Sequence, residues 1–401
     1  MTPQSNILKT SIDVELCRKH TPGCETKVHF NNAGASLMPV QVMEAQKEYI
    51  DQEMAQGGYE TADARAADIN GFYKSMGQLL GCSPLNIAFT SSATNSFARA
   101  LSSIPFEKGD SILLANEDYI SNQLAFLSME KRLGVILHRA RSLQTGGVDI
   151  DDMREMMDRH HPRLVSISHV PTNSGLVQPV EEIGKLCRER DILYLVDGCQ
   201  SAGQMPVDVL KIDCDFFTGT FRKFLRGPRG SGFMFVSDHV LRQDLWPVYL
   251  DMRGADWTEK NSFRIRNDAR RFEDWELPYS LLLGSAAAVN YALGVGLGNI
   301  QERNSFLCDQ IREKLKSLNL QTLDRGTLLS SIITALIPGK NATEVLNSLR
   351  AMNINTSIAS RSSAVIDFDA KRVSWALRIS PHYYNTTEEI ELLARGIGKI
   401  L

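Results

Sequence analysis

ILYLVD, residues 192–197, and FFTGTF, residues 216–221, are short apolar runs of the kind that indicates this protein's fold class. Helix-like amphipathic stretches such as PVEEIGKLCRERD separate these runs. Five further runs of the same character lie at 87–90, 111–115, 135–140, 164–170 and 233–236. Apolar strands buried on both faces and separated by crossover helices are typical of an α/β domain. We therefore expect a large α/β domain with a mostly parallel central sheet.

The C-terminal third of the chain has a different character. After about residue 280 come two long helical patterns, then strands, and a last helix preceded by the capping pattern Thr386–Thr387–Glu388–Glu389. This order is typical of a smaller α+β domain. We expect a large domain over residues 30–285, with residues 1–29 and 286–401 forming an N-terminal arm and a small C-terminal domain.

Composition excludes several classes of protein. The 401 residues are 43% hydrophobic, and 44 basic against 47 acidic side chains give a net charge of −3. These values argue against a disordered chain and against a nucleic-acid partner. No apolar run is long enough to span a bilayer, and the polar N-terminal sequence lacks the apolar region of a signal peptide. We expect a cytoplasmic protein without a membrane partner.

The cysteines predict neither disulfides nor a metal site. Seven cysteines, an odd number spread over a long chain, do not form a disulfide framework. The cluster Cys17, His20 and Cys24 lacks a fourth ligand with the usual spacing for zinc. We expect reduced thiols and no bound metal.

Two residues at strand ends suggest covalent amine chemistry. Asp197 ends the run ILYLVD, and Lys223 lies in TGTFRKFLRGPRGSG between a strand and a glycine-rich turn. Ligands of parallel sheets bind beyond the carboxyl ends of the strands. A catalytic lysine needs a pKa lowered by burial or by neighbouring cations, which Arg222 and Arg226 could supply. Taken alone, Asp197 would equally suit a helix cap, and Lys223 a solvated residue.

A third segment has the features of an anion site. In FTSSATNSFARAL a strand ends at Thr90 and continues through Ser91 and Ser92 into a helix. Hydroxyl groups and free backbone N–H groups at a helix start attract anions such as phosphate. Thr220 and Arg222 are further candidate phosphate donors. A plain N-cap without a ligand is the alternative interpretation of this segment.

Taken in order, these motifs resemble a known family. DGCQSAG, TGTFRKFLRGPRGSG, FTSSATNS, SISHVPTNSGLVQPV and LRISPHYYNTTEEI together resemble the class V aminotransferase and cysteine desulfurase-like family of fold-type I pyridoxal-phosphate enzymes. The resemblance runs from about His29 to the C-terminus. It implies the pyridoxal-phosphate transferase fold, bound pyridoxal 5'-phosphate, an amino acid substrate, and a homodimer with the active site at the interface.

The resemblance implies roles for residues around the ring of the cofactor. Lys223 corresponds to the lysine that forms the Schiff base, and Asp197 to the partner of the pyridine nitrogen, which makes the ring an electron sink. Gln200 corresponds to the donor to the phenolic oxygen. Tyr119 corresponds to the aromatic residue that stacks on the ring, although it would also suit a tyrosine at the edge of the core.

The resemblance also implies a phosphate site and a substrate clamp. Ala93, Thr94, Thr220 and Arg222 correspond to the phosphate site, although desulfurases usually have histidine at the position of Arg222. Arg378 in LRISPHYYNT corresponds to the arginine that binds the substrate carboxylate, for which its planar guanidinium is suited. An exposed strand arginine is the alternative for Arg378.

Other positions depart from the desulfurase pattern. Asn32 is expected to face the substrate, while Thr172 stands where the family usually has asparagine and Asn173 follows it, so either of the two is a candidate cofactor contact. Glu276 stands near the position of a threonine that contacts phosphate across the subunit interface. The stretch SIASRSSAVIDFDAKRVSWALR, where desulfurases carry the attacking cysteine, contains no cysteine.

These features leave several reactions open. We expect a pyridoxal-phosphate enzyme that deprotonates Cα of an α-amino acid with Lys223, as an aminotransferase or an enzyme similar to isopenicillin N epimerase. The first alternative is a C–S β-lyase or desulfurase-like enzyme without a catalytic cysteine. The second is a non-catalytic binding protein of the same fold. Cys199, between Asp197 and Gln200, is expected to be a packing residue.

Overall fold

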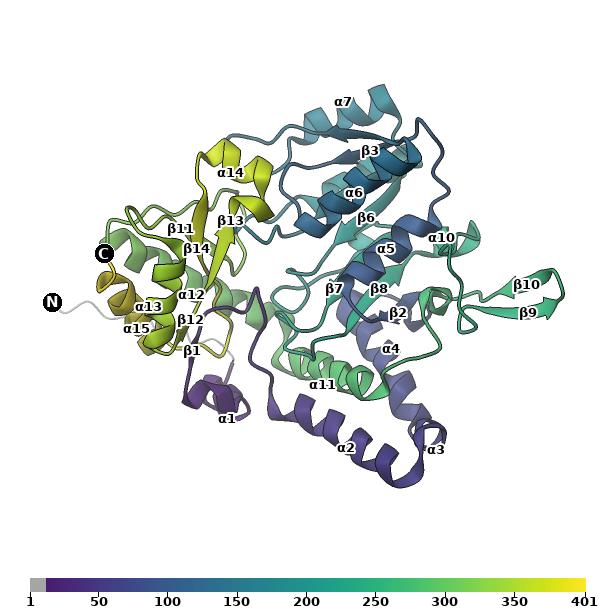
Figure 1. Ribbon diagram of the computed structural model, residues 1–401, viewed down its shortest axis with the longest axis horizontal. Coiled ribbons are helices and arrows are strands. Elements are labelled where there is room, and N and C mark those ends of the chain that lie inside the picture. Colours follow the sequence, from purple (N-terminus) through teal and green to yellow (C-terminus); the bar gives the residue numbers. More distant parts are fainter. Residues whose placement is uncertain (1–11) are drawn as a thin grey trace.

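A seven-stranded sheet forms the centre of the molecule in the computed structural model, which describes residues 12–401 (Figure 1). The strand order is β2-β8-β7-β6-β5-β3-β4. All pairs are parallel except those of β8, which is antiparallel to both of its neighbours. The strands are β2 (Ile87–Thr90), β3 (Ser111–Leu114), β4 (Ile136–Arg139), β5 (Leu164–Ser168), β6 (Leu193–Asp197), β7 (Phe216–Thr220) and β8 (Gly232–Val236). The predicted α/β fold with a mostly parallel sheet is confirmed.

Helices cover both faces of this sheet because its strands are apolar on both sides. Along β6, Leu195 packs with Phe126 on one face, and Tyr194 and Val196 pack in the cluster that contains Phe72 on the other. The first face is covered by α5 (Ala93–Ser103), α6 (Ile120–Leu133) and α10 (Asp238–Arg242). The second is covered by α4 (Ala66–Leu80), α7 (Ile150–His160), α8 (Val180–Glu189), α9 (Val209–Ile212) and α11 (Tyr279–Val295).

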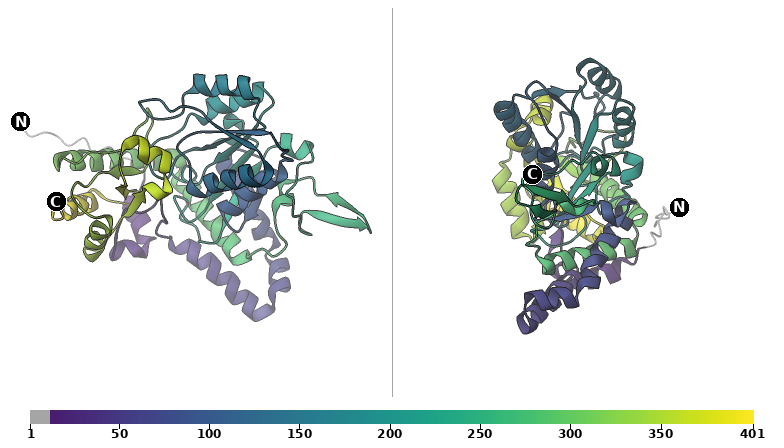
Figure 2. Two further views of the ribbon diagram at one scale, coloured as in Figure 1. Left: turned by 45° about the horizontal axis from the view of Figure 1, so that its top comes forward. Right: turned by 90° about the vertical axis from the view of Figure 1, so that its right-hand side faces the viewer.

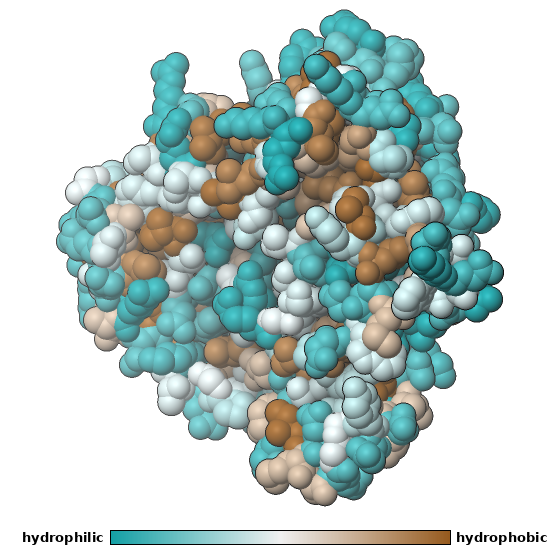
Figure 3. All heavy atoms as spheres, turned by 45° about the vertical axis from the view of Figure 1, so that its right-hand side comes forward, coloured by the Kyte–Doolittle hydropathy of each residue, from teal (hydrophilic) through white to brown (hydrophobic). Residues whose placement is uncertain are grey.

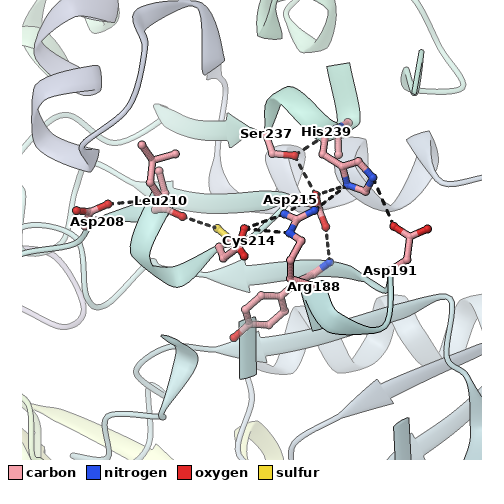
Figure 4. A network of polar contacts seen from close by, with 12 residues as sticks. Arg188, Asp191, Asp208, Leu210, Cys214, Asp215, Ser237 and His239 are labelled. Atoms are coloured by element: carbon pink, nitrogen blue, oxygen red, sulfur yellow. Dashed lines mark hydrogen bonds and ion pairs between the residues drawn. The ribbon is translucent and has the colours of Figure 1, made fainter. Parts of the chain in front are cut away.

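The two ends of the parallel strands differ in character. At the amino end, the carboxylate of Asp215 accepts hydrogen bonds from the backbone N–H of Tyr194 (3.0 Å) and from Ser237 Oγ (2.9 Å), with His239 Nδ1 at 3.1 Å (Figure 4). Arg188 Nη2 lies 3.8 Å from the same carboxylate. These contacts tie β6, β7, α8 and α10 together. The opposite, carboxyl end is therefore the edge available for a ligand.

A smaller unit packs beside the sheet and contains the C-terminus (Figure 1). Its antiparallel sheet has the order β11-β14-β13, and β1 pairs with β12 in a parallel pair. The capping box predicted at Thr386 and Glu389 is present at the start of the last helix. The elements are α12 (Leu297–Ser317), α13 (Ala342–Ala351), α14 (Val365–Lys371), α15 (Thr387–Gly398), β1 (Val28–His29), β11 (Ile333–Ala335), β12 (Ile354–Asn355), β13 (Ser357–Ser360) and β14 (Trp375–Ile379).

The remaining elements lie at the periphery, where a hairpin extends away from the body of the molecule (Figure 2). The hairpin pairs β9 (Ala255–Glu259) with β10 (Ser262–Ile265). The other elements are α1 (Val14–Lys19), α2 (Val40–Gln56), α3 (Gly58–Ala64) and the 3-10 helices Pro22–Glu25, Pro84–Asn86, Ala269–Phe272 and Arg361–Ser363.

The expected boundary after residue 285 falls inside helix α11. This helix packs along its length against α2 and α4, so it belongs with the large sheet. The chain then bends by 77° into α12 at Gly296, whose φ of 89° suits glycine. We propose Gly296 as the boundary between the domains. Within residues 12–401 no single helix is long and apolar enough to cross a membrane; α11 and α12 meet that length and composition requirement only as a bent pair.

Candidate active site

Lys223 lies buried at the carboxyl edge of the sheet, in the turn that follows β7. Its side chain is 6% exposed, and it has no hydrogen-bond or ion-pair partner among residues 12–401. Its Nζ lies 5.8 Å from the centre of the Tyr119 ring. Burial, together with the charges of Arg222 and Arg378, lowers the pKa of Lys223, while Asp197 opposes this effect. A buried amine with a lowered pKa is suited to nucleophilic and base chemistry.

Asp197 occupies the end of the neighbouring strand β6. Its Oδ1 accepts a hydrogen bond from the backbone N–H of Cys199, and its Oδ2 accepts one from Asn122 Nδ2, both at 2.9 Å. Gly198 follows because a Cβ there would lie 1.9 Å from the Phe217 ring. The carboxylate is 6% exposed and held on both oxygens, so its orientation is set before any ligand arrives.

The segment predicted to bind an anion lies where β2 leads into α5. Ser92 Oγ caps the helix by accepting from the backbone N–H of Asn95, which leaves the N–H groups of Ala93 and Thr94 outside this cap. Gly232 pairs with the last residue of β2 and with Thr220 of β7, and a Cβ on Gly232 would lie 2.4 Å from Ser92 C. The sheet register therefore brings Thr220 next to the start of α5.

Arg222 behaves differently from the other phosphate candidates. Its Nη1 donates to the backbone carbonyl of Gly34, and burial with the nearby Arg229 lowers the pKa of its guanidinium. Thr220 Oγ1 donates to the carbonyl of Ser231 at 3.3 Å. The structure thus places Thr220 beside the start of α5 and directs Nη1 of Arg222 toward Gly34 in the segment that follows β1.

Arg378, on β14 of the smaller unit, points toward this edge of the sheet. It is 7% exposed, and its Nη1 and Nη2 have only long contacts, 3.4 Å to Thr172 O and 3.3 Å to Asn31 Oδ1. Its Nε is buried without a partner. Burial, with the charge of Arg222, lowers the pKa of Arg378 to about 10. A buried and poorly paired guanidinium is suited to bind a carboxylate through two parallel hydrogen bonds.

The structure distinguishes the candidates at the Arg378 end of the site. Asn32 does not face this region, because its side chain is fully buried, donates to Ser380 O (2.8 Å) and accepts from Tyr384 Oη (2.5 Å). Its neighbour Asn31 contacts Arg378 instead. We therefore replace Asn32 by Asn31 as the candidate substrate contact.

Thr172 and Asn173 point to different parts of the site. Thr172 Oγ1 accepts from Gln200 Nε2 at 3.2 Å, and the Thr172 carbonyl faces Arg378. Asn173 Nδ2 donates to Ser363 O at 3.2 Å, which joins the β5 loop to the segment before α14. Of the two residues, Thr172 is the one that lies among the candidate cofactor residues.

Unpaired polar atoms test whether the site suits pyridoxal phosphate. Gln200 Nε2 is used by Thr172 and by Ala33 O (3.1 Å), so the free atom is the acceptor Oε1 rather than the expected donor. Thr218 Oγ1, in register with Asp197, is also buried without a partner. Buried polar atoms usually have partners, so their grouping with the free amine of Lys223 fits a polar ligand at this edge.

The sequence departs from the desulfurase pattern at Glu276 and in the lack of a cysteine before Arg378, and the surroundings of the glutamates and of Cys199 bear on both departures. Glu276 is exposed, whereas Glu273 is buried and accepts from Tyr73 Oη (2.8 Å) and the N–H of Phe89 (2.8 Å). Burial raises the pKa of the Cys199 thiol well above its ordinary value, and Asp197 adds to the rise. Cys199 is thus a neutral, buried thiol. Within residues 12–401 no group of three or more potential ligands is placed to hold a metal ion.

Comparison with known proteins identifies the family. The family model described as aminotransferase class V matches residues 28–393. The chain belongs to this family. Its members use pyridoxal 5'-phosphate, so the predicted family, cofactor and enzyme class are confirmed. The lysine, the aspartate and the unpaired polar atoms described above lie together at one site that fits this cofactor.

Two curated relatives of this class V chain differ in the reaction for which they are named. A probable cysteine desulfurase of Methanothermobacter thermautotrophicus is 25% identical over 97% of this chain and 96% of its own length. Isopenicillin N epimerase of Streptomyces clavuligerus is 26% identical over 82% of this chain and 83% of its own length. Relatedness alone therefore supports the class V enzyme and leaves its reaction open.

Solved structures share the fold of this class V enzyme at low sequence identity. The apo cysteine desulfurase of Thermococcus onnurineus NA1 has a TM-score of 0.89 at 23% identity and covers 96% of this chain and 97% of its own. The cystine C–S lyase C-DES, in complex with its product cysteine persulfide, has a TM-score of 0.83 at 21% identity and covers 94% and 99%. Another C-DES structure holds glycine covalently linked to the pyridoxal-phosphate cofactor.

Three polar residues at the site were not anticipated from the sequence. Asp118, Asn122 and Ser168 are buried beside Asp197 and hydrogen-bonded to one another or to it. Asp118 and Asn122 flank Tyr119 in NEDYISN, and Ser168 ends a strand. The position of Ser168 at a strand end was the available signal, while the direction of the other two depends on how α6 packs.

Proposed function

We propose that this class V enzyme breaks the Cβ–S bond of a sulfur-containing α-amino acid. Lys223 acts as the base, and no cysteine of the protein acts as a nucleophile. The C–S bond is proposed because of the relatives named as cysteine desulfurases and the shared fold of a cystine C–S lyase. The aminotransferase or epimerase alternative stays a prediction, as does the cytoplasmic location.

The observation that carries the thiol-free form of the proposal is the composition of the segment that contacts Asn173. This segment, residues 360–366, approaches the site through the contact between Ser363 O and Asn173 Nδ2, and it contains serines but no cysteine. Cys199 is the cysteine whose thiol interacts with the charge of Lys223, and its raised pKa keeps it protonated. Since the thiolate is the nucleophilic form, a protein persulfide is not supported.

The cofactor contacts that the resemblance implies are supported by the positions of the residues concerned. Bound pyridoxal phosphate supplies an electron sink next to Cα of the amino acid. Asp197 would keep the ring nitrogen protonated, and Tyr119 would stack on the ring. The backbone N–H groups of Ala93 and Thr94 would bind the phosphate at the start of α5.

Substrate binding and proton transfer fall to two further residues. Arg378 would bind the α-carboxylate, and Lys223 Nζ would take the proton from Cα. The electron pair of the broken Cβ–S bond would leave with the sulfur as a thiolate, which is then protonated. The three-carbon remainder, released as 2-aminoacrylate, reacts with water to give pyruvate and ammonia, so the reaction needs no oxidant or reductant.

Epimerisation is the second candidate because of the isopenicillin N epimerase relative. It would begin with the same proton transfer to Lys223 but return a proton to the opposite face of Cα. Deuterium from the solvent would then appear at Cα of the recovered amino acid, without loss of sulfur. A cofactor spectrum that responds to no amino acid would instead favour a non-catalytic binding protein.

The test begins with the lysine. Protein loaded with pyridoxal phosphate should show a visible absorbance band, and borohydride reduction should fix the cofactor on the peptide that contains Lys223. Lys223→Ala should remove the band, whereas Lys211→Ala, at an exposed lysine on α9, should keep it. With cystine and S-substituted cysteines, pyruvate, ammonia and a thiol or persulfide should form in equal amounts. Formation of only an epimer or a transamination product would refute the C–S proposal.

We also propose a homodimer, on the evidence of exposed apolar side chains. Trp257 and Phe263 of the protruding hairpin are 81% and 50% exposed, and nearby Tyr249 and Met252 are 85% and 68% exposed. Figure 3 shows apolar side chains gathered on the face that includes this side of the molecule. Exposed apolar surface of this kind is typical of a protein interface. Sedimentation velocity should give twice the mass of 44.7 kDa, and a species of that single mass would contradict the proposal.

A further inference from the structure

Two buried carboxylates at the carboxyl edge of the sheet share one amide group. Asn122 Nδ2 donates to Asp197 Oδ2 at 2.9 Å and to Asp118 Oδ1 at 3.1 Å. Because both hydrogen bonds start from the same nitrogen, the two oxygens lie within about 6 Å of each other. Asp118 is 8% exposed and Asp197 is 6% exposed, so little water screens the two groups from one another.

The surroundings of Asp118 suit the charged form of a carboxylate. Besides Asn122, the donors are Ser168 Oγ at 2.6 Å, Gln123 Nε2 at 2.7 Å and the backbone N–H of Tyr119 at 2.7 Å. Four donors on two oxygens match the acceptor capacity of an ionised carboxylate. Burial raises the pKa of Asp118 and Asp197 adds to the rise, while the side-chain donors oppose it. The hydrogen bonds therefore favour the charged carboxylate, whereas burial and the second carboxylate oppose it.

The charged groups around this pair come from several elements. Arg139 of β4 reaches Asp118 indirectly, because its Nη2 donates to Gln123 Oε1 at 2.5 Å. The other ionisable groups that interact with Asp197 or Lys223 are Cys199, Arg222 and Arg378. None of the residues 12–401 forms an ion pair within 4 Å of Asp118 or Asp197. The pair thus lacks a direct countercharge of its own.

We propose that Asp118 is a positioning residue for the cofactor, which acts through Asn122 to orient Asp197 and adds a second negative charge that favours a protonated ring nitrogen. The inference rests on the proposed role of Asp197. It extends that role to a residue that is linked to Asp197 through the shared amide of Asn122. The competing explanation is that Asp118 has only a structural role. It accepts a hydrogen bond from the backbone N–H of Tyr119, which is the N-cap residue of α6.

Asp118→Asn removes the charge with little change in volume. Glu117→Gln is the matched control, because it removes the same charge one position earlier from a carboxylate that contacts Ser142 Oγ rather than Asn122. Both variants and the wild type are loaded with pyridoxal phosphate. The visible band is titrated with pH, the dissociation constant of the cofactor is measured, and the thermal midpoint is recorded as a readout of structure.

We expect Asp118→Asn to move the titration midpoint to lower pH by about one unit and to weaken cofactor binding roughly tenfold, because a nearby negative charge stabilises the protonated cofactor. Glu117→Gln should move the midpoint by less than about half a pH unit and change the dissociation constant by less than about threefold. An Asp118→Asn midpoint equal to that of Glu117→Gln would overturn the inference, even with a lowered thermal midpoint.

A second variant covers the case in which Asp118→Asn does not fold. Ser168→Ala removes the donor with the shortest hydrogen bond to Asp118 and favours the neutral form of Asp118. It should therefore move the titration midpoint of the visible band to lower pH, by less than Asp118→Asn does. A titration midpoint of Ser168→Ala identical to that of the wild type would then overturn the inference. Absence of any cofactor band in the wild type would instead refute the proposed function, so the two failures are distinguishable.

Discussion

Replacing Arg378 tests whether the guanidinium on β14 recognises a carboxylate. Its contacts with Thr172 O and Asn31 Oδ1 are 3.4 and 3.3 Å long, outside the usual range for N–H···O bonds, and its Nε has no partner. The guanidinium therefore retains its capacity for two strong bonds. A hydrogen bond to a charged group contributes about 1.5–3 kcal/mol, so two would contribute about 3–6 kcal/mol, or roughly 10² to 10⁴ in affinity.

The assay compares two small ligands that differ in the carboxylate. Cofactor-loaded protein is titrated with glycine and with methylamine, and the change in the visible spectrum gives each dissociation constant. Wild type should prefer glycine by roughly 10² to 10⁴, and Arg378→Leu should lose that preference. Arg378→Lys keeps the charge but lacks the planar pair of donors, so it should lose roughly 10- to 100-fold of the preference.

The control and the refuting result concern the same ratio. Arg350→Leu, at an exposed arginine on α13 of the same unit, should leave the glycine-to-methylamine ratio unchanged. If Arg378→Leu still binds glycine more than about tenfold better than methylamine, the carboxylate is recognised elsewhere. This outcome would leave the roles proposed for Lys223 and Asp197 untouched, because the spectrum itself reports cofactor binding.

Two further predictions concern stability. Burial lowers the pKa of His29 and of His169 to about 4, so the unfolded chain, with histidines near 6.5, binds more protons and stability is lost as the pH falls from 6.5 toward 4. For His169 this loss is about 2 kcal/mol between pH 7.5 and pH 5, and His169→Gln should remove it from urea unfolding; an unchanged pH dependence would contradict it. Gly184→Ala should destabilise by about 3 kcal/mol, because its Cβ would lie 1.8 Å from the Ile212 carbonyl oxygen. Gly71→Ala adds a Cβ in α4 that meets nothing within 4 Å and should stabilise by about 0.5–1 kcal/mol. Thermal melts of the two glycine variants measure this difference, and equal midpoints would refute the packing argument.

The positions of the strands were predictable because the sequence pattern of a strand is local. Each predicted run coincides with a strand to within two residues at either end, since apolar and β-branched runs bounded by turns can bury both faces. The antiparallel direction of β8 also has a local cause in the sequence. The connection from Thr220 to Gly232 is too short for a crossover helix, and a parallel pair needs one.

The domain boundary required the packing of α11. Its sequence predicts a long helix but not the surface that the helix covers, so the change in sequence character after about residue 280 predicts a boundary after residue 285. In the structure α11 packs on α2 and α4 and ends at Gly296, which supports the proposed boundary there. Helix partners far apart in the chain leave no local mark in the sequence.

The sequence alone predicted that Lys223 and Asp197 lie at one edge of the sheet, because Asp197 ends one predicted strand and Lys223 follows the next, and parallel strands share their carboxyl edge. It also determined the family and the lack of a cysteine before Arg378. Only the tertiary structure decided that Asn31 rather than Asn32 reaches Arg378, and that Asp118 shares Asn122 with Asp197. The physical reason is that side-chain direction at a turn depends on the backbone there, and contacts between residues 75 positions apart arise only when the helices and strands that carry them pack together.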